Sequence, residues 1–230
     1  MHLFGHLSII IYRMNAITAT PVCLFHLFFP KLLVILYYKG VTLYMLDFIQ
    51  SADTEIILFI QNNIRVPFID AIMIFMSYLG EAGIVWVAIS LILIFRKKYR
   101  MAGICTLAAM ALCYVLNDLI LKEIVHRPRP FDTITQLTAL GFKPSSWSFP
   151  SGHACSSFVA ALTLTKFLGK KGSLSYILAV LIAVSRPYAG VHYVSDIIAG
   201  AIFGTLCALI IFEILRRTGL MARLERRFLR

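Results

Sequence analysis

The chain has 230 residues, of which 60% are hydrophobic and 14% charged, and it carries a formal net charge of +11 at pH 7. Its mean hydropathy of +0.83 exceeds what the core of a soluble protein of this length requires, which excludes a soluble globular domain and indicates an integral membrane protein. The Lys and Arg residues stand in short clusters between apolar runs, without a basic face or interleaved aromatic residues, so we expect no nucleic acid as a partner.

Residues 1–44 form an apolar N-terminal extension that the pattern leaves open. Its central run, residues 20–38, could be an extra span or the hydrophobic region of an uncleaved signal, although two prolines, a histidine and a lysine weaken both interpretations. A third hypothesis places the natural start at Met45, because the codons for Lys39, Gly40 and Val41 can contain a ribosome-binding sequence. On that hypothesis the extension is not part of the natural chain.

Residues 45–66 are expected to form an amphipathic helix in the membrane interface. Apolar side chains such as Phe48, Ile56 and Phe59 alternate at helical spacing with polar ones such as Asp53 and Glu55, a pattern typical of a helix that lies along a bilayer surface.

Five apolar runs follow, at residues 68–95, 101–121, 154–168, 174–184 and 194–215. We therefore predict an all-α integral membrane bundle of about five to six transmembrane helices over residues 67–217, followed by a basic cytoplasmic tail at 218–230. The first run is too long for one upright helix and contains Gly80, Glu81 and Gly83, so it is either strongly tilted or broken into two helices.

The cysteines are expected to be small buried apolar side chains. The count of five is odd, no CxxC pair occurs, and each cysteine stands in or beside an apolar run. Neither disulfides nor metal ligands are favoured by this pattern.

Positive charge predicts the orientation in the membrane. The clusters at residues 96–100, 166–171 and 216–230 should face the cytoplasm, as positively charged loops do. If the spans alternate, the loop at 122–153 and the turn at 185–192 then both face outward. We expect a multi-pass protein of the plasma membrane with a cytoplasmic C-terminus.

Three short blocks stand at the outward ends of these runs: KEIVHRPRP at 122–130, PSGH at 150–153 and SRPYAGVHYVSD at 185–196. They bring three cations, Lys122, Arg129 and Arg186, to one side of the membrane. Charged groups at membrane depth are costly and by default indicate function. Planar guanidinium groups in particular suit the binding of phosphate oxygens.

PSGH predicts a helix N-terminus that can bind an anion. Ser151 is a good N-cap, Gly152 allows the backbone to approach a ligand, and the apolar run begins after His153. In the third block, His192 and Asp196 are four residues apart and would share one helix face. The carboxylate can then fix the imidazole tautomer and leave the other ring nitrogen free to react.

Each block taken alone also fits an ordinary structural role. Lys122 could be a snorkelling lysine paired with Asp118, PSGH could be a simple helix cap, and the His192 and Asp196 pair could be an interfacial hydrogen bond.

Taken together, the three blocks resemble the signature of the type 2 phosphatidic acid phosphatase family, KxxxxxxRP, PSGH and SRxxxxxHxxxD, with every defining position filled. The resemblance covers about residues 68–215. It implies a membrane helical bundle with an active site at the outer leaflet, no metal or other cofactor, and a phosphohistidine intermediate.

The resemblance also implies a role for each matching position. His192 would be the nucleophile, held by Asp196, and His153 would protonate the leaving group. The phosphate would be bound by Lys122, Arg129, Arg186, the Ser151 hydroxyl and the Gly152 N–H. His126, Arg127 and Asp132 lie outside the motif and are treated as neighbours.

A lipid phosphate presented at the bilayer surface is the expected substrate, because the loops are too short for a large soluble cap. Among compact bacterial members of the family we favour undecaprenyl diphosphate, with phosphatidylglycerophosphate or phosphatidic acid as the alternative. Hypotheses of other classes are an anion transporter, a vanadate-dependent haloperoxidase and an inactive lipid-binding protein. The pattern does not predict the oligomeric state.

Overall fold

The computed structural model describes residues 41–219 of the chain. Two compact units meet between Gln50 and Ser51, and the fold and site below belong to the second unit. Most of the predicted extension at 1–44 and of the predicted tail at 218–230 lies outside the described residues.

Helices and their connections make up the whole of the described part, and residues 41–219 contain no β-strand. The all-α prediction is confirmed. The main helices are α3 (Val41–Asn63), α4 (Pro67–Leu79), α5 (Ile84–Phe95), α6 (Arg100–Tyr114), α9 (Gly152–Leu168), α11 (Ser175–Tyr188) and α12 (Val194–Arg217). Short helices connect them: η1 (Glu81–Gly83), η2 (Lys97–Tyr99), η3 (Val115–Leu121), α7 (Lys122–Val125), α8 (Pro130–Thr133) and α10 (Lys170–Ser173).

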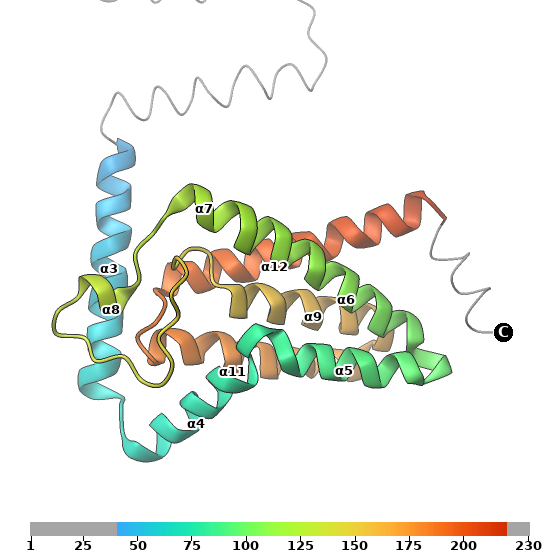
Figure 1. Cartoon of the computed structure of the whole chain (residues 1–230), viewed down its shortest axis with the longest axis horizontal. Helices are drawn as coiled ribbons and strands as arrows, with labels where there is room; N and C mark the ends of the chain where they lie inside the picture. Colours follow the sequence, from blue (N-terminus) through green and yellow to red (C-terminus); the bar gives the residue numbers. More distant parts are fainter. Residues whose placement is uncertain (1–40, 220–230) are drawn as a thin grey trace, which may run out of the picture. The chain divides into compact units, whose positions relative to one another are not determined.

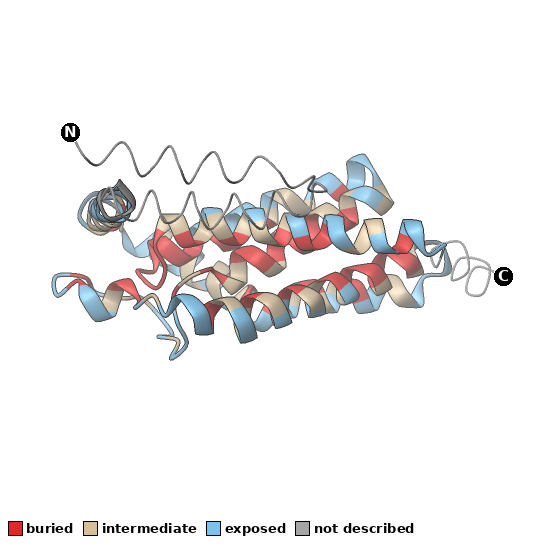
Figure 2. Cartoon of the chain, turned by 90° about the horizontal axis from the view of Figure 1, so that it is seen from above, coloured by how far each residue is buried: buried red, intermediate tan, exposed pale blue. Residues whose placement is uncertain are grey.

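Helix α9 is the centre of the bundle and packs against α6, α11 and α12 (Figure 1). Its inward residues are small, including the fully buried Ala160, Ala161 and Ser157, and small residues let helix backbones approach closely. One such close approach is to α12, where a Cβ on Gly204 would lie 2.2 Å from the carbonyl oxygen of Cys155. Buried residues accordingly gather on the facing sides of the helices (Figure 2).

Two helical stretches among the described residues are long and apolar enough to cross a bilayer, Lys97–Thr133 and Val194–Arg217. The pair Pro67–Leu79 and Glu81–Phe95 makes a third candidate, bent by 50°. Helices α9 and α11, with 17 and 14 residues, are shorter than the roughly 20 residues of a full span. The membrane-spanning bundle thus agrees with the prediction, while the count of five to six spans stays a prediction.

The bend answers the question that the sequence left open at residues 68–95: the run is two helices, α4 and α5. The backbone turns left-handed at Ala82 (φ 48°) and Gly83 (φ 69°), a conformation that helices do not contain. This break places Glu81 beside the N-terminus of α9, which η1 contacts.

Helices α6, η3 and α7 continue one another from Arg100 to Val125, with a π-helical segment at Val115–Leu121. The helix ends because His126 takes a left-handed conformation (φ 51°). π-helical segments are frequent at functional sites, and this one carries Asp118 and is followed directly by Lys122.

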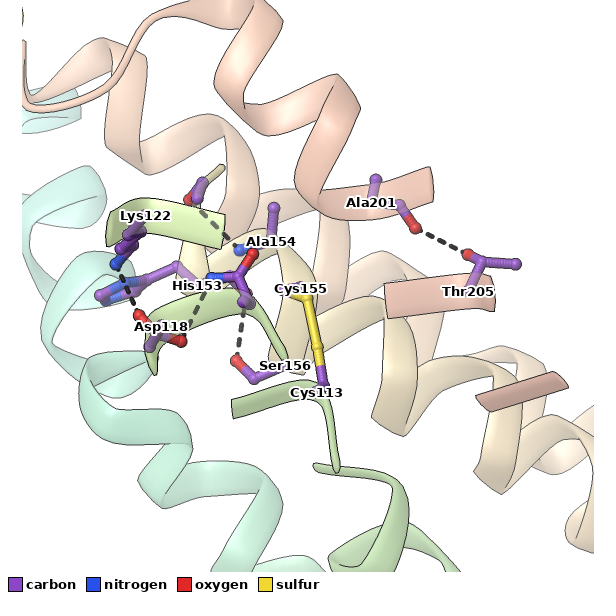
Figure 3. Close-up of a disulfide and its surroundings, with 11 residues drawn as sticks. Cys113, Asp118, Lys122, His153, Ala154, Cys155, Ser156, Ala201 and Thr205 are labelled. Atoms are coloured by element: carbon purple, nitrogen blue, oxygen red, sulfur yellow. Dashed lines mark hydrogen bonds and ion pairs between the residues drawn. A yellow bond between two sulfur atoms is a disulfide. The ribbon is translucent and has the colours of Figure 1, made fainter. Parts of the chain in front are cut away.

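Cys113 of α6 and Cys155 of α9 form a disulfide (Figure 3), so the expectation of unpaired cysteines is wrong for this pair. The two residues are 42 positions apart in the chain, and only the packing of α6 against α9 brings them together. Cys207 is a buried free cysteine, as expected, whereas Cys23 lies outside the described residues.

The second half of α3 packs on the rest of its unit through Ile57, which is fully buried with Ile134, Leu137 and Tyr193. Asp53, which the amphipathic pattern placed among the polar positions, is also buried at 3% exposure. Phe59 on the same helix is 58% exposed. The helix is therefore present as predicted, but its buried face includes a carboxylate.

Candidate active site

A cavity of about 450 Å³ lies at one end of the bundle and is lined by residues of η1, α5, α6, η3, α7, α9 and α11 and of the connections between helices. Six of the eight predicted site residues line it: Lys122, Arg129, Gly152, His153, Arg186 and His192. Ser151 and Asp196 are fully buried and stand behind this lining. The three sequence blocks therefore meet in space.

His192 lies in the loop between α11 and α12 and is 2% exposed. Its Nε2 is 3.1 Å from Nη1 of Arg129, and a guanidinium can only donate. Nε2 must then be the lone-pair nitrogen, and Nδ1 carries the proton towards Oδ2 of Asp196 at 3.4 Å. This is the tautomer that leaves Nε2 able to attack a substrate.

Burial lowers the pKa of His192 to about 3, and the positive charge of Arg129 adds to this effect, while the hydrogen bond with Asp196 opposes it. The imidazole is consequently neutral at physiological pH. A neutral ring with a free lone pair is the form that a nucleophile needs.

The Asp196 carboxylate is fixed by more partners than His192 alone. Its Oδ2 accepts hydrogen bonds from Ser148 Oγ at 2.5 Å and from the Tyr193 N–H at 2.9 Å, and its Oδ1 accepts one from Arg127 at 2.6 Å. Ser148 Oγ also lies 3.4 Å from His192 Nδ1. The backbone of Asp196 accepts from the Ser151 N–H at 3.1 Å, which ties the PSGH block to α12.

The two arginines of the cavity differ in how their donors are used. Arg129 is held by the carbonyl oxygens of Val191 at 2.8 Å and Ser146 at 2.6 Å as well as by His192. Arg186 is 2% exposed, and its Nη1 donates to the hydroxyl of Ser77, yet its Nε and Nη2 are buried without a partner. A buried guanidinium with two unused donors is costly unless an anion completes it.

Lys122 is paired with Asp118 at 2.6 Å, as the spacing of four residues suggested. At 5% exposure it is buried against the cavity and does not reach outward as a snorkelling lysine would. A Cβ on Gly152 would lie 3.2 Å from the same Asp118 carboxylate, so only a small residue fits there. Figure 3 shows Lys122, Asp118 and His153 together, near the disulfide.

His153 begins α9 and points to the break after α4. Its Nε2 is 3.2 Å from the carbonyl oxygen of Ser77 and 3.6 Å from the Glu81 carboxylate. Both neighbours are acceptors, so this nitrogen carries a proton. A Cβ on Gly80 would come within 2.8 Å of the His153 ring. The glycine therefore allows the ring to lie close to the backbone at residue 80.

Ser151 caps α9, its hydroxyl accepting from the Ala154 N–H at 3.4 Å. The N-cap prediction is confirmed, whereas its predicted contact with phosphate stays a prediction. Within residues 41–219, no cluster of three His, Cys, Asp or Glu side chains is arranged to hold a metal ion.

Sequence reasoning missed four polar residues at or behind the cavity: Glu81, Asp118, Arg127 and Ser148. Arg127 was treated as a neighbour, and Asp118 only as the partner of Lys122. The RPRP run did contain a signal, since a second arginine, Arg127, stands two residues before Arg129 on the same rigid segment, and its guanidinium reaches two carboxylates.

The family model described as the PAP2 superfamily matches residues 102–219, which is just over half of the chain. The chain belongs to this superfamily. An undecaprenyl-diphosphatase of Sulfolobus acidocaldarius is 31% identical over 165 residues, covering 71% of this chain and 79% of that protein. Phosphatidylglycerophosphatase B of Bacillus subtilis is 34% identical over 177 residues, covering 69% and 80%.

The crystal structure of a transmembrane PAP2 type phosphatidylglycerolphosphate phosphatase from Bacillus subtilis is also similar. Its TM-score is 0.58 at 31% identity, with 86% of this chain and 96% of that chain covered. The PAP2 protein described here is accordingly a phosphatase of the lipid-phosphate type and a multi-pass membrane protein.

Proposed function

We propose that this PAP2 protein hydrolyses a lipid diphosphate at the extracytoplasmic membrane surface, with undecaprenyl diphosphate as its substrate, through a phosphohistidine intermediate. The observation that carries the proposal is the pair of unpartnered donors on Arg186 in the cavity that also contains the lone-pair nitrogen of His192. An anionic group bound by Arg186 would lie beside a nucleophile.

In the proposed first step, His192 Nε2 attacks phosphorus, the P–N bond forms and the bond to the leaving oxygen breaks. Asp196 stabilises the positive charge that develops on the ring through the Nδ1–H. Lys122, Arg129 and Arg186 offset the charge of the phosphoryl oxygens. His153 gives the leaving oxygen a proton from Nε2.

In the second step, water attacks the phosphohistidine, His153 takes the water proton and inorganic phosphate leaves. His153 is protonated again at that point, so the cycle returns every group to its starting state. Burial and the positive charge of Arg186 lower the pKa of His153 well below its usual value. The imidazolium that the first step requires is therefore favoured only by the bound anionic substrate, with the Glu81 carboxylate 3.6 Å away.

A lipid fits the cavity better than a soluble ester does. Beside the cations, the wall is formed by apolar side chains of α5 and α6, namely Val87, Leu107, Met110 and Ala111. Such a wall can contact an acyl or prenyl chain but offers no hydrogen bonds to a polar alcohol. The undecaprenyl-diphosphatase relative supports the diphosphate, and the Bacillus subtilis sequence and crystal structure support phosphatidylglycerophosphate as the second candidate.

The outward orientation is supported by two independent features. The positively charged clusters at residues 96–100 and 166–171, together with Arg216 and Arg217, lie at the helix ends remote from the cavity. The Cys113–Cys155 disulfide lines the cavity. Disulfides persist mainly on the oxidising side of a membrane. On this orientation the C-terminus is cytoplasmic.

A phosphate-release assay with the purified protein in EDTA tests both the substrate preference and the independence of metal ions. It compares three lipids side by side: undecaprenyl diphosphate, phosphatidylglycerophosphate and phosphatidic acid. We expect the highest kcat/KM for undecaprenyl diphosphate, and we expect no turnover by His192→Ala. Turnover by His192→Ala would exclude the phosphohistidine, and activity lost in EDTA would exclude a metal-independent reaction. Protein inactive on all three lipids would favour a transporter or an inactive lipid binder.

Orientation is tested with a membrane-impermeant maleimide. Ser145→Cys, in the exposed loop before α9, should be labelled in intact cells, whereas Arg217→Cys at the end of α12 should be labelled only after permeabilisation. The reverse pattern would place the cavity in the cytoplasm.

A further inference from the structure

An ionic cluster that the proposed chemistry does not use lies directly behind Asp196. Arg127 donates from Nη1 to Asp196 Oδ1 at 2.6 Å and from Nη2 to Asp53 Oδ2 at 2.8 Å. Both carboxylates are buried, at 0% and 3% exposure. One guanidinium therefore joins the carboxylate beside His192 to a second carboxylate on α3.

The cluster is built on the first turn of α12. The Ser195 N–H donates to Asp53 Oδ1 at 3.0 Å, and the Ser195 hydroxyl donates to Asp53 Oδ2. The same hydroxyl accepts from Arg127 at 2.7 Å, and the guanidinium lies 4.0 Å from the ring centre of Tyr193. Both Nη atoms of Arg127 and both carboxylate oxygens of Asp53 are thus hydrogen-bonded, which fixes the plane of the guanidinium.

The two oxygens of Asp196 have separate partners as a result. Oδ1 is taken by Arg127, while Oδ2 faces Ser148, the Tyr193 N–H and His192. The contact with His192 is the longest of these, at 3.4 Å, so His192 does not itself set the carboxylate. Its orientation depends on Arg127 on one side and on the helix turn on the other.

Charge balance makes Arg127 and Asp53 interdependent. Two buried carboxylates at one helix N-terminus repel each other, and the shared guanidinium offsets both. Without Arg127 the site would hold an uncompensated pair of negative charges. If the negative charge of Asp53 is removed as well, only the charge of Asp196 remains.

We propose that Asp53 and Arg127 are positioning residues that hold the Asp196 carboxylate towards Nδ1 of His192; this rests on the proposed function. Neither residue touches the substrate, since neither lines the cavity. The pair connects the His192 and Asp196 site to helix α3, which lies outside all three sequence blocks.

The test compares kcat and KM for lipid phosphate hydrolysis in Arg127→Gln, Asp53→Asn and the double variant. Arg127→Gln should lower kcat about 10- to 100-fold, the size of one charged hydrogen bond, with KM nearly unchanged because the cavity cations are intact. Adding Asp53→Asn should raise kcat of Arg127→Gln at least about 3-fold, as expected for directly coupled residues.

Arg127→Lys keeps the positive charge but loses the planar guanidinium that bonds to two carboxylates. Its kcat should therefore lie between that of the wild type and that of Arg127→Gln. Arg65→Gln is the matched control, because Arg65 also bonds through its guanidinium, to the carbonyl oxygens of Tyr188 and Thr138, away from Asp196. Asp53→Asn should not rescue it. Melting temperature and elution volume in detergent show which variants are folded.

The inference is overturned if Arg127→Gln keeps wild-type kcat while His192→Ala is inactive. It is also overturned if the losses in the double variant simply multiply, or if Arg127→Lys is no better than Arg127→Gln. Turnover by His192→Ala overturns the proposed function instead, whatever Arg127→Gln does.

Discussion

Replacing Arg186 by methionine should make the ligand-free protein more stable and nearly inactive. The side chain is 2% exposed and its Nε and Nη2 have no partner. The guanidinium is therefore buried without the hydrogen bonds that would offset the free-energy cost of its dehydration. Methionine is unbranched, apolar and adaptable enough to fill most of the same space. The variant removes the unused donors and loses one hydrogen bond, to Ser77.

The two effects can be sized from these contacts. Replacing a poorly compensated buried charge with an apolar side chain is often stabilising by about 1–4 kcal/mol, and about 1 kcal/mol corresponds to roughly 2–4 °C in Tm for a chain of this size. Two lost charge-assisted bonds to a phosphate, at about 1.5–3 kcal/mol each, correspond to a loss of about 10²- to 10⁴-fold in kcat/KM.

Thermal unfolding in detergent, with and without orthovanadate as a phosphate mimic, measures stability and anion binding, and the phosphate-release assay measures kcat/KM. An anion present at a concentration about 100 times its Kd stabilises the folded protein by about 2.7 kcal/mol. Vanadate should therefore raise the Tm of the wild type but not that of Arg186→Met. Arg65→Met is the control, because the Arg65 guanidinium is fully engaged with backbone carbonyls and its loss should lower Tm. An Arg186→Met protein that melts below wild type and still responds to vanadate would refute the reasoning.

Three further outcomes are expected. His153→Ala should impair monophosphate hydrolysis more than diphosphate hydrolysis, because a lipid alkoxide needs a proton more than a lipid phosphate does; equal losses, with chemistry rate-limiting, would exclude His153 as the acid. Because the pKa of His192 is lowered to about 3 from an unfolded value near 6.5, the unfolded state binds the extra proton as pH falls through that window. The free energy of unfolding should therefore drop there by up to about 1.4 kcal/mol per pH unit, less steeply in His192→Asn, and equal slopes would contradict a buried neutral ring. Reducing the Cys113–Cys155 bond, which closes a loop of 42 residues, should lower stability by about 4 kcal/mol; a Cys113→Ala variant should lose the same amount and show no further effect of reductant.

The chemistry of the cavity was predictable from short local patterns. Four residues of the cavity each stand at or near an end of an apolar run: Lys122, Arg129, Arg186 and His192. Runs that cross one membrane bring such ends to the same surface. The pair of Asp118 with Lys122 needed only helical spacing and occurs in the structure. His192 and Asp196 are also in contact, but the expectation that they share one helix face is wrong, because His192 lies in the loop before α12.

Partners set by packing between helices were not predictable. The disulfide joins residues that no local pattern relates, and the cysteine expectation failed for that reason. Asp53 was assigned to the polar positions of an amphipathic helix, because periodicity reports which side chains are polar but not whether an arginine from a distant segment will neutralise one of them.

The sequence by itself determined the all-α membrane class and the set of candidate site residues, because hydropathy and motif spacing are properties of single segments. Only the tertiary structure decided that run 68–95 breaks at Gly80–Gly83, that Arg186 keeps two unpartnered donors while Arg129 is saturated, and that Arg127 links Asp53 to Asp196. These features depend on distances between helices, which follow from the small residues of α9 and α12 packing together.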